Sequence, residues 1–251
     1  MIKIGTWLLG FVWLLALGSS APAYRPFGTE DAGGAGRGVF QTELSWDYLK
    51  WSDDKLERNL LLVPIYGLTD NLELSLEVPY LIHQPASGAS YHGVGDINLV
   101  LKDLVISESE RSPALTVKSV FKMESGDFNL GLGSGDKDYS LFAVATKTAG
   151  KFVFHGQIGY SWLGKGKISS LRDITVYGLA VDYLFTDRLH LLAELNGNRH
   201  PDSTATDDPR AWLVGINYKL TDKIIFDAAG KWGLSKASPD WNLMTGLSVT
   251  I

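Results

Sequence analysis

The sequence predicts an all-β protein, an antiparallel up-and-down transmembrane β-barrel of about twelve strands with both termini in the periplasm. Three observations predict this fold. Segments of about ten residues alternate polar and apolar side chains, and the links between these segments are alternately long and short. After the N-terminal stretch, no apolar run is long enough for a membrane-spanning helix. Because only helices and closed barrels satisfy the backbone inside a bilayer, an integral protein with this pattern must be a barrel.

Residues 66–80 show the alternation most clearly. A tight turn at residues 69–71 precedes a strand, since Asp and Asn tolerate the positive φ of hairpin turns. Apolar and polar side chains then alternate with the period of a strand that has two unlike faces. A soluble β-sandwich turns the apolar face inward, whereas a membrane barrel turns it outward to lipid. The apolar residues are Leu72, Leu74, Leu76 and Val78, and the polar ones between them are Glu73, Ser75 and Glu77.

The N-terminus has the features of a secretory signal peptide. Lys3 precedes an apolar run over residues 7–17, and small residues follow up to Ala23. We therefore expect residues 1–23 to be a signal peptide that is removed after Ala23. A membrane anchor is the weaker alternative, because the run is shorter than the roughly 20 residues that span a bilayer.

The composition restricts the function classes. Without residues 1–23, 228 residues remain with a formal charge of −6, since Lys3 is the one charged residue removed. A net acidic chain without clustered Lys and Arg argues against nucleic acid as a partner. The sequence has no cysteine, so an exported chain of this kind gains no stability from disulfides. We expect one domain, the barrel over residues 39–251.

Residues 24–38 form a separate segment before the barrel. They are rich in glycine and show no periodicity, which predicts a mobile segment in the periplasm or the lumen. The sequence leaves open whether this segment occupies the lumen.

Twelve strands follow, and their links differ in length by parity. Tight turns are expected at residues 69–71, 148–150, 186–188 and 221–222, after even strands, whereas the links after odd strands are long; the link at 107–112 is an exception. Outer-membrane barrels have short periplasmic turns and long outer loops, and a sandwich has no reason to sort its loops in this way. The predicted strands are residues 39–50, 60–66, 72–78, 96–103, 114–123, 139–148, 152–162, 175–183, 189–196, 212–219, 224–231 and 243–251. Residues 81–94 are predicted to be a long loop.

Aromatic and charged side chains agree with the barrel. Tyr and Trp gather near the expected strand ends, where their rings meet both lipid and water. Charged residues fall on the polar faces, where burial in a sandwich core would cost several kcal/mol each and a wet lumen would cost little. The candidate lumen-lining residues are Glu43, Glu73, Glu77, Asp96, Lys102, Lys118, Lys122, His155, Asp182, Glu194, Asp227 and Lys231.

These lumen charges have two interpretations. Lys102, Lys118 and Lys122 lie on neighbouring strands while acids predominate elsewhere, and such a separation could set a field that orients a passing solute. Alternatively, acids and lysines pair across the lumen and fill it, as in small barrels.

Several motifs resemble an outer-membrane transporter family known as "putative MetA-pathway of phenol degradation". They are Arg25-Pro-Phe-Gly-Thr-Glu-Asp-Ala32, Gly38-Val-Phe-Gln-Thr-Glu-Leu44, Tyr66-Gly-Leu-Thr-Asp-Asn-Leu-Glu73, Gly93-Val-Gly-Asp96, Gly131-Leu-Gly-Ser-Gly-Asp136, the segment 155–160 and Ser238-Pro-Asp240. The resemblance implies an outer-membrane β-barrel that moves small molecules, aromatic or hydrophobic ones included, and it brings no catalytic residues. Members of such families commonly end in Phe. This chain ends in Ile251, but its last strand keeps the apolar alternation that the insertion machinery recognises.

Catalytic, metal and cofactor patterns are weak. Residues 131–138 are rich in glycine but lack the complete pattern of a phosphate loop or a calcium site, so we expect a plain outer loop. His155 is followed by Gly156 and Gln157 rather than by a serine two positions on, as a barrel phospholipase would need. The five histidines show no ligand spacing. We expect no enzyme, no metal and no cofactor.

The sequence therefore predicts an exported barrel in the outer membrane of a Gram-negative bacterium that passes or binds small molecules. Its expected partners are outer-membrane lipid, the insertion machinery acting on the C-terminal strand, and a small solute. The alternatives are a non-conducting structural barrel, an outer-membrane enzyme and, least favoured, a soluble periplasmic sandwich.

Overall fold

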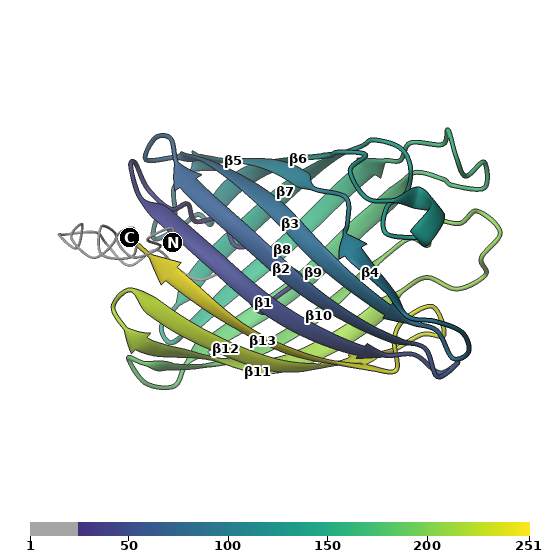
Figure 1. Cartoon of the computed structure of the whole chain (residues 1–251). Coiled ribbons are helices and arrows are strands. Elements are labelled where there is room, and N and C mark those ends of the chain that lie inside the picture. The colour runs from purple at the N-terminus through teal and green to yellow at the C-terminus, as the bar shows by residue number, and fades with distance from the viewer. Residues whose placement is uncertain (1–24) are drawn as a thin grey trace, which may run out of the picture.

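A computed structural model describes residues 25–251, so the predicted signal peptide lies outside the described residues. The described residues form one antiparallel sheet that closes on itself (Figure 1), because β1 pairs with both β2 and β13 and β2 also pairs with β3. The strands are β1 (Phe40–Lys50), β2 (Leu56–Gly67), β3 (Leu72–Gln84), β4 (Tyr91–Val94), β5 (Asn98–Ile106), β6 (Ala114–Lys122), β7 (Asp138–Ala149), β8 (Phe152–Trp162), β9 (Ile174–Leu184), β10 (Leu189–Asn198), β11 (Arg210–Thr221), β12 (Ile224–Gly233) and β13 (Trp241–Thr250).

β4 and β5 share one place in the barrel wall. Tyr80 of β3 pairs with Val94 of β4, and Glu77 of the same strand pairs with Asn98 of β5. The wall therefore has twelve strand positions, which confirms the predicted fold class. Among the described residues, no helix is long and apolar enough to cross a membrane.

The two faces of the wall are polar inside and apolar outside. Along β1, Gln41, Glu43 and Ser45 are buried while Phe40 and Leu44 are exposed; Glu43 is 4% exposed and Leu44 is 50% exposed. Burial of the polar face and exposure of the apolar face is the reverse of a soluble sandwich and is the arrangement of a barrel in lipid. The large apolar side chains on the outer face include Leu62, Leu76, Leu101, Val117, Leu141, Leu179 and Leu243.

The two ends of the barrel differ in their links. At one end, which we call the termini end, the C-terminus and the start of β1 lie together with the short turns (Figure 1). At the other, the loop end, lie the links over residues 51–55, 85–90, 123–137, 163–173, 199–209 and 234–240. The link at 107–113 is the longer one at the termini end.

The predicted loop over residues 81–94 is wrong. β3 continues to Gln84, and β4 lies inside the predicted loop. The alternation is lost there because Leu81 and Ile82 are both apolar, although they point to opposite faces of the sheet. Leu132 of the 123–137 loop covers the inner face at this height, so the inner face is apolar as well: a Cβ added at Gly93 would lie 2.7 Å from Leu132 Cδ1.

Candidate functional site

The lumen is occupied by residues 25–39, which we call the lumen segment. Its composition predicts mobility, yet its backbone is hydrogen-bonded to side chains from several strands. Glu194 of β10 accepts hydrogen bonds from the backbone N–H groups of Thr29 (2.5 Å) and Gly28 (3.1 Å). Near the termini end, Glu73 of β3 accepts a hydrogen bond from the Ala35 N–H at 2.7 Å. Two lumen-facing carboxylates therefore hold the segment by its backbone.

Apolar contacts also hold the lumen segment. Ala35 packs with Val63 and Ile65 of β2, and Ala32 packs with Ala114 and Val144 on the opposite part of the wall. Alanine is small enough to bring the segment backbone against both walls, and each such contact removes apolar surface from water.

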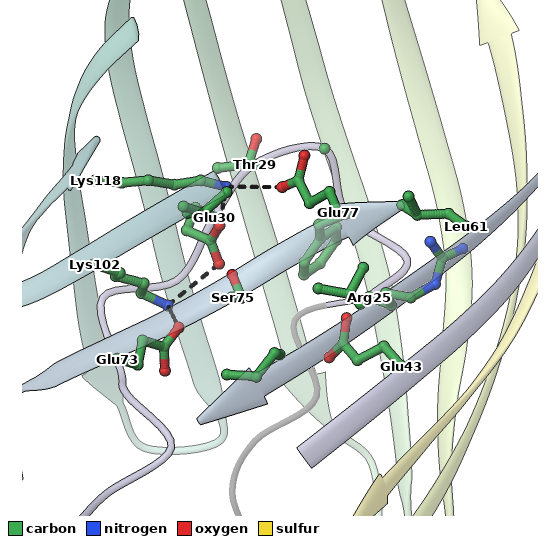
Figure 2. A pocket seen from close by; sticks show the side chains of 15 residues that line it. Arg25, Thr29, Glu30, Glu43, Leu61, Glu73, Ser75, Glu77, Lys102 and Lys118 are labelled. Atoms are coloured by element: carbon green, nitrogen blue, oxygen red, sulfur yellow. Dashed lines mark hydrogen bonds and ion pairs between the residues drawn. The ribbon is translucent and has the colours of Figure 1, made fainter. Parts of the chain in front are cut away.

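Glu30 is the centre of an ion-pair network inside the lumen (Figure 2). Its carboxylate accepts hydrogen bonds from Lys118 Nζ at 2.6 Å and Lys102 Nζ at 3.2 Å. Asp31 lies 3.7 Å and Glu73 lies 3.9 Å from Lys102 Nζ, while Lys118 Nζ lies 3.8 Å from Glu77. Two lysines from β5 and β6 are thus shared among four carboxylates, two of them from the lumen segment. Such charge-assisted hydrogen bonds are the strong ones in a low-dielectric interior.

Arg25 pairs with a second group of acids on the other side of the lumen. Its guanidinium lies 3.6 Å from Asp47 of β1 and 3.7 Å from Asp227 of β12. Asn217 of β11 donates a hydrogen bond to the Arg25 carbonyl at 3.0 Å. The N-terminal part of the segment is therefore held by backbone contact and by longer-range charge.

A cavity of about 200 Å³ lies between the lumen segment and the wall formed by β1, β2, β3, β5 and β6 (Figure 2). One side is apolar, formed by Leu61, Val63 and Ile65 of β2, and Val100 of β5 lies beyond Ser75 of β3, which pairs with both Ile65 and Val100. The opposite sides carry the network around Glu30, together with Glu43, Ser75 and Glu77. The cavity therefore offers an apolar wall and a charged rim to a molecule of roughly one ring, because its volume exceeds that of a few waters by a wide margin.

A second cavity of about 230 Å³ lies on the other side of the lumen segment, against β8–β12. Gly28 lines both cavities, so the segment separates them. The second cavity combines amide groups of Gln157, Asn196 and Asn198 with Lys231 and with apolar groups such as Val176 and Ala211. The lumen is thus divided into one chamber with an apolar wall and one with amide groups.

At the loop end, Asp96 holds the 123–137 loop over the lumen. Asp96 accepts hydrogen bonds from the backbone N–H groups of Gly126 (2.9 Å), Ser134 (2.8 Å) and Ser125 (3.2 Å), and it pairs with Lys122 at 3.2 Å. The two glycine-rich motifs of the sequence, 93–96 and 131–136, therefore pack against each other.

The same loop is tied to its neighbour by Asp136. The backbone N–H groups of Gly166 (2.7 Å) and Lys137 (2.8 Å) donate to this carboxylate and hold its pKa below the usual value of an aspartate. Because Gly166 belongs to the 163–173 loop, this hydrogen bond joins the two loops.

The structure places all the predicted lumen residues on the inner side but distributes them over four groups. Glu73, Glu77, Lys102 and Lys118 surround Glu30, with Glu43 beside them in the cavity wall. Glu194 and Asp227 contact the lumen segment, and Lys231 lines the second cavity. Asp96 and Lys122 hold the loop, whereas Asp182 pairs with His190 at 2.9 Å and His155 contacts Phe27.

Sequence reasoning missed the partners that the lumen segment supplies to Lys102, Lys118, Glu194 and Asp227. Arg25, Glu30 and Asp31 carry charge in a stretch without periodicity, and their partners lie far away in sequence: 72 residues separate Glu30 from Lys102. The apolar strip on β2 was also missed. The sequence contains one indication of it: β2 is apolar at consecutive positions, as expected for a strand whose two faces both contact apolar surroundings.

Comparison with known proteins now places the chain. A family model described as "Putative MetA-pathway of phenol degradation" matches residues 23–251. The chain belongs to this family. No curated protein sequence matches the chain.

Solved structures share the fold of this family member. An outer membrane channel from Pseudomonas putida F1 has 17% sequence identity and a TM-score of 0.72, and the match covers 88% of this chain and 98% of that one. The KdgM porin has 10% identity and a TM-score of 0.54, with 82% and 98% covered. The CymD monoaromatic hydrocarbon channel has 10% identity and a TM-score of 0.50, with 85% and 88% covered. At these identities the likeness shows the outer-membrane barrel fold.

Proposed function

We propose that this protein is an outer-membrane channel for small molecules with an apolar part about the size of one ring. The termini end faces the periplasm and the loop end faces outward, as the short and long links suggest. The lumen segment occludes the channel at rest and moves aside when a solute passes.

The cavity beside Glu30 carries this proposal. A pore for ions and sugars needs polar walls, but here Leu61, Val63 and Ile65 form an apolar strip along β2 inside a polar lumen. Burial of one ring against such a strip is favourable because it removes apolar surface from water. The solved barrels support the proposal, since one of them is described as a channel for monoaromatic hydrocarbons.

Ion current through the refolded protein in planar bilayers tests the channel. We expect a small KCl conductance, and a larger one when residues 25–36 are deleted. If the wild-type protein and the deletion variant both fail to conduct, the protein is a non-conducting barrel and the proposal is wrong.

Block of this current tests the cavity. Phenol and cyclohexanol should occupy the cavity and lower the current, whereas glycerol should not, because it has no apolar face. Val100→Phe fills the cavity and should weaken the block by phenol; Val214→Phe, on the lipid-facing side of β11, is the matched control. If phenol blocks the current through Val100→Phe and Val214→Phe equally, the solute binds in another part of the lumen.

The proposal includes no catalysis. His155 is 3.0 Å from the Thr146 hydroxyl, but that hydroxyl accepts a hydrogen bond from the Ala32 N–H of the lumen segment. His190 is paired with Asp182, and among the described residues no group of three or more acids and histidines could hold a metal ion. These groups position the segment and the wall rather than a reacting solute.

A further inference from the structure

The lipid-facing wall has a hollow of about 620 Å³ across β11, β12, β13 and β1. Its floor consists of three small outward-facing residues, Ala228, Gly230 and Thr245. Strand pairing places these residues side by side: Ala228 pairs with Thr245, and Thr245 pairs with Trp46 of β1. Because an ordinary barrel wall carries large apolar side chains at this depth, the small residues leave space that lipid must fill.

Larger side chains frame the hollow. Val214 borders the floor on the β11 side and Leu243 on the β13 side. Trp232 forms another edge and stacks on Trp212 at a centroid distance of 4.6 Å. Tryptophan prefers the depth where acyl chains meet headgroups, so these rings place the upper edge of the hollow near a headgroup layer.

The opposite wall is only partly similar. Leu141 beside Tyr160 is a large outward pair there, although Ala143, Ala145 and Gly156 are small residues on the same outer face. The hollow across β11–β13 and β1 is therefore distinguished by its small floor together with its tryptophan frame, and not by small residues alone.

A cation lies on β2, the strand next to the β1 edge of the hollow. Trp46 lines the hollow, Tyr48 follows on the same face of β1 with its ring 6.1 Å from Trp46, and Tyr48 stacks on Trp241 at 5.5 Å. The Arg58 guanidinium lies 5.6 Å above the Tyr48 ring. Within the part of the chain that the structure describes, Arg58 bonds only the neutral amide of Gln84, at 3.4 Å, whereas the nearby Lys50 is neutralised by Asp54. Arg58 is thus available to an anion at the headgroup level.

We propose that this hollow binds one molecule of the phosphorylated, multiply acylated glycolipid that forms the outer leaflet of the outer membrane. One acyl chain lies on the floor of Ala228, Gly230 and Thr245, and a phosphate contacts Arg58. Tyr48 and Arg58 lie on the loop-end side of Trp46, which lines the hollow, so the phosphate would lie toward the loop end. The assignment to the outer leaflet rests on the orientation given in the proposed function. A phospholipid such as phosphatidylethanolamine has two chains and a zwitterionic headgroup, which match this site less well.

Native mass spectrometry of the folded, detergent-purified protein tests the site with added lipids. The probes are bisphosphoryl lipid A, monophosphoryl lipid A, phosphatidylglycerol and phosphatidylethanolamine. We expect one bisphosphoryl lipid A to remain bound at detergent activation energies that remove the phospholipids. Retention of phosphatidylglycerol or phosphatidylethanolamine to the same degree would overturn the proposal, and lipid-free dimers would assign the hollow to a second copy of the chain instead.

Two substitutions separate the parts of the site. Arg58→Gln should lower lipid A retention about tenfold, the effect expected for loss of one charge-assisted hydrogen bond. It should also reduce the difference in retention between bisphosphoryl and monophosphoryl lipid A. Ala228→Leu fills the floor and should lower retention to a similar degree. Arg188→Gln at the termini end and Ala143→Leu on the opposite wall are the matched controls.

Heat-dependent gel migration confirms that each variant is folded before its lipid content is compared. If the two site variants retain lipid A as the controls do, the hollow is not the binding site. Lipid retention is measured without ion current, so failure here leaves the channel proposal untouched, and a non-conducting protein leaves the lipid site untouched.

Discussion

The lumen segment has two charged contacts with the wall, one at Glu30 and one at Arg25, and they differ in strength. Glu30 receives hydrogen bonds from two lysines, at 2.6 and 3.2 Å, and further acids surround the same lysines. Arg25 faces two acids at 3.6 and 3.7 Å, distances too long for hydrogen bonds. One region thus has charged groups that also form hydrogen bonds, while the guanidinium of the other has charge alone and a single hydrogen bond holds the Arg25 backbone.

This difference indicates how the lumen segment would move. Contacts that depend on bonding geometry break over a short distance, whereas longer-range charge weakens gradually. The Arg25 end can therefore shift first, while the Glu30 end remains bound and keeps the segment inside the barrel. A solute entering the cavity between the two regions would displace the weakly held part and leave the segment able to return.

Glu30→Gln should have the largest effect on occlusion. It removes the carboxylate charge that both Lys102 and Lys118 contact, and it weakens the binding of the lumen segment to the wall by roughly 1.5–3 kcal/mol, the range for hydrogen bonds to charged groups. Mean conductance in planar bilayers should rise. Glu108→Gln is the control, since Glu108 pairs with Lys147 at 3.0 Å outside the lumen. An unchanged conductance in Glu30→Gln would show that the network does not hold the segment.

Gly178→Ala tests the Glu30 region without changing any charge. A Cβ at Gly178 of β9 would clash with the hydroxyl of Thr29, the residue before Glu30. Thr29 is 1% exposed and its N–H is bonded to Glu194, so it cannot move aside cheaply. Overpacking of this kind costs roughly 1–3 kcal/mol. Conductance should rise less than in Glu30→Gln, and a decrease would mean that the methyl group narrows the pore without displacing the segment.

Arg25→Gln should have a smaller effect than either. No hydrogen bond of the guanidinium to Asp47 or Asp227 is lost, because none is formed. The variant leaves the buried Asp227 without its cation, but this cost falls on the wall rather than on the lumen segment, and it is lowered when the carboxylate takes up a proton. The measurement is the same conductance at low and high KCl. Because salt screens buried charges little, any difference between the variant and the wild type should persist at high salt. If conductance rises as much as in Glu30→Gln, the Arg25 region holds the lumen segment as strongly as the Glu30 region does.

The strands of the barrel wall could be predicted from the sequence because each strand follows a local rule. A lipid outside and a wet lumen inside impose alternation at every strand, so faces such as those of β1 follow from spacing alone. The exceptions have a shared cause. β3 near Leu81 and β2 near Val63 face apolar protein on the inner side, Leu132 in the first case and Ala35 in the second, and the alternation disappears where both faces are apolar.

The candidate site was only half predictable for a different reason. Lys102 and Lys118 could be placed in the lumen by their strands, but their main partner, Glu30, belongs to a segment without secondary structure. Its position depends on backbone hydrogen bonds to Glu73 and Glu194, which are contacts between distant parts of the chain. The glycine-rich composition predicts a mobile segment. Composition alone does not show that the lumen supplies hydrogen-bond acceptors for the backbone N–H groups of this segment.

Gly246→Ala should have the smallest effect and is the sharpest comparison with Gly178→Ala. Gly246 of β13 lies beneath the second region, and a Cβ there would meet Asp227 and lie 2.8 Å from Arg25 Nε. Asp227 and Arg25 meet this methyl group with the ends of their side chains, and no hydrogen bond joins them, whereas Thr29 is fixed through its backbone N–H. The buried Asp227 and Arg25 must turn together, but this should cost less than moving the backbone at Thr29. Conductance should then resemble the wild type, and combining Gly246→Ala with Arg25→Gln should add little, because the shorter glutamine leaves Asp227 room to turn. If Gly246→Ala opens the channel as far as Gly178→Ala does, Arg25 is held rigidly, and the segment would have to leave the lumen as one unit rather than from its Arg25 end.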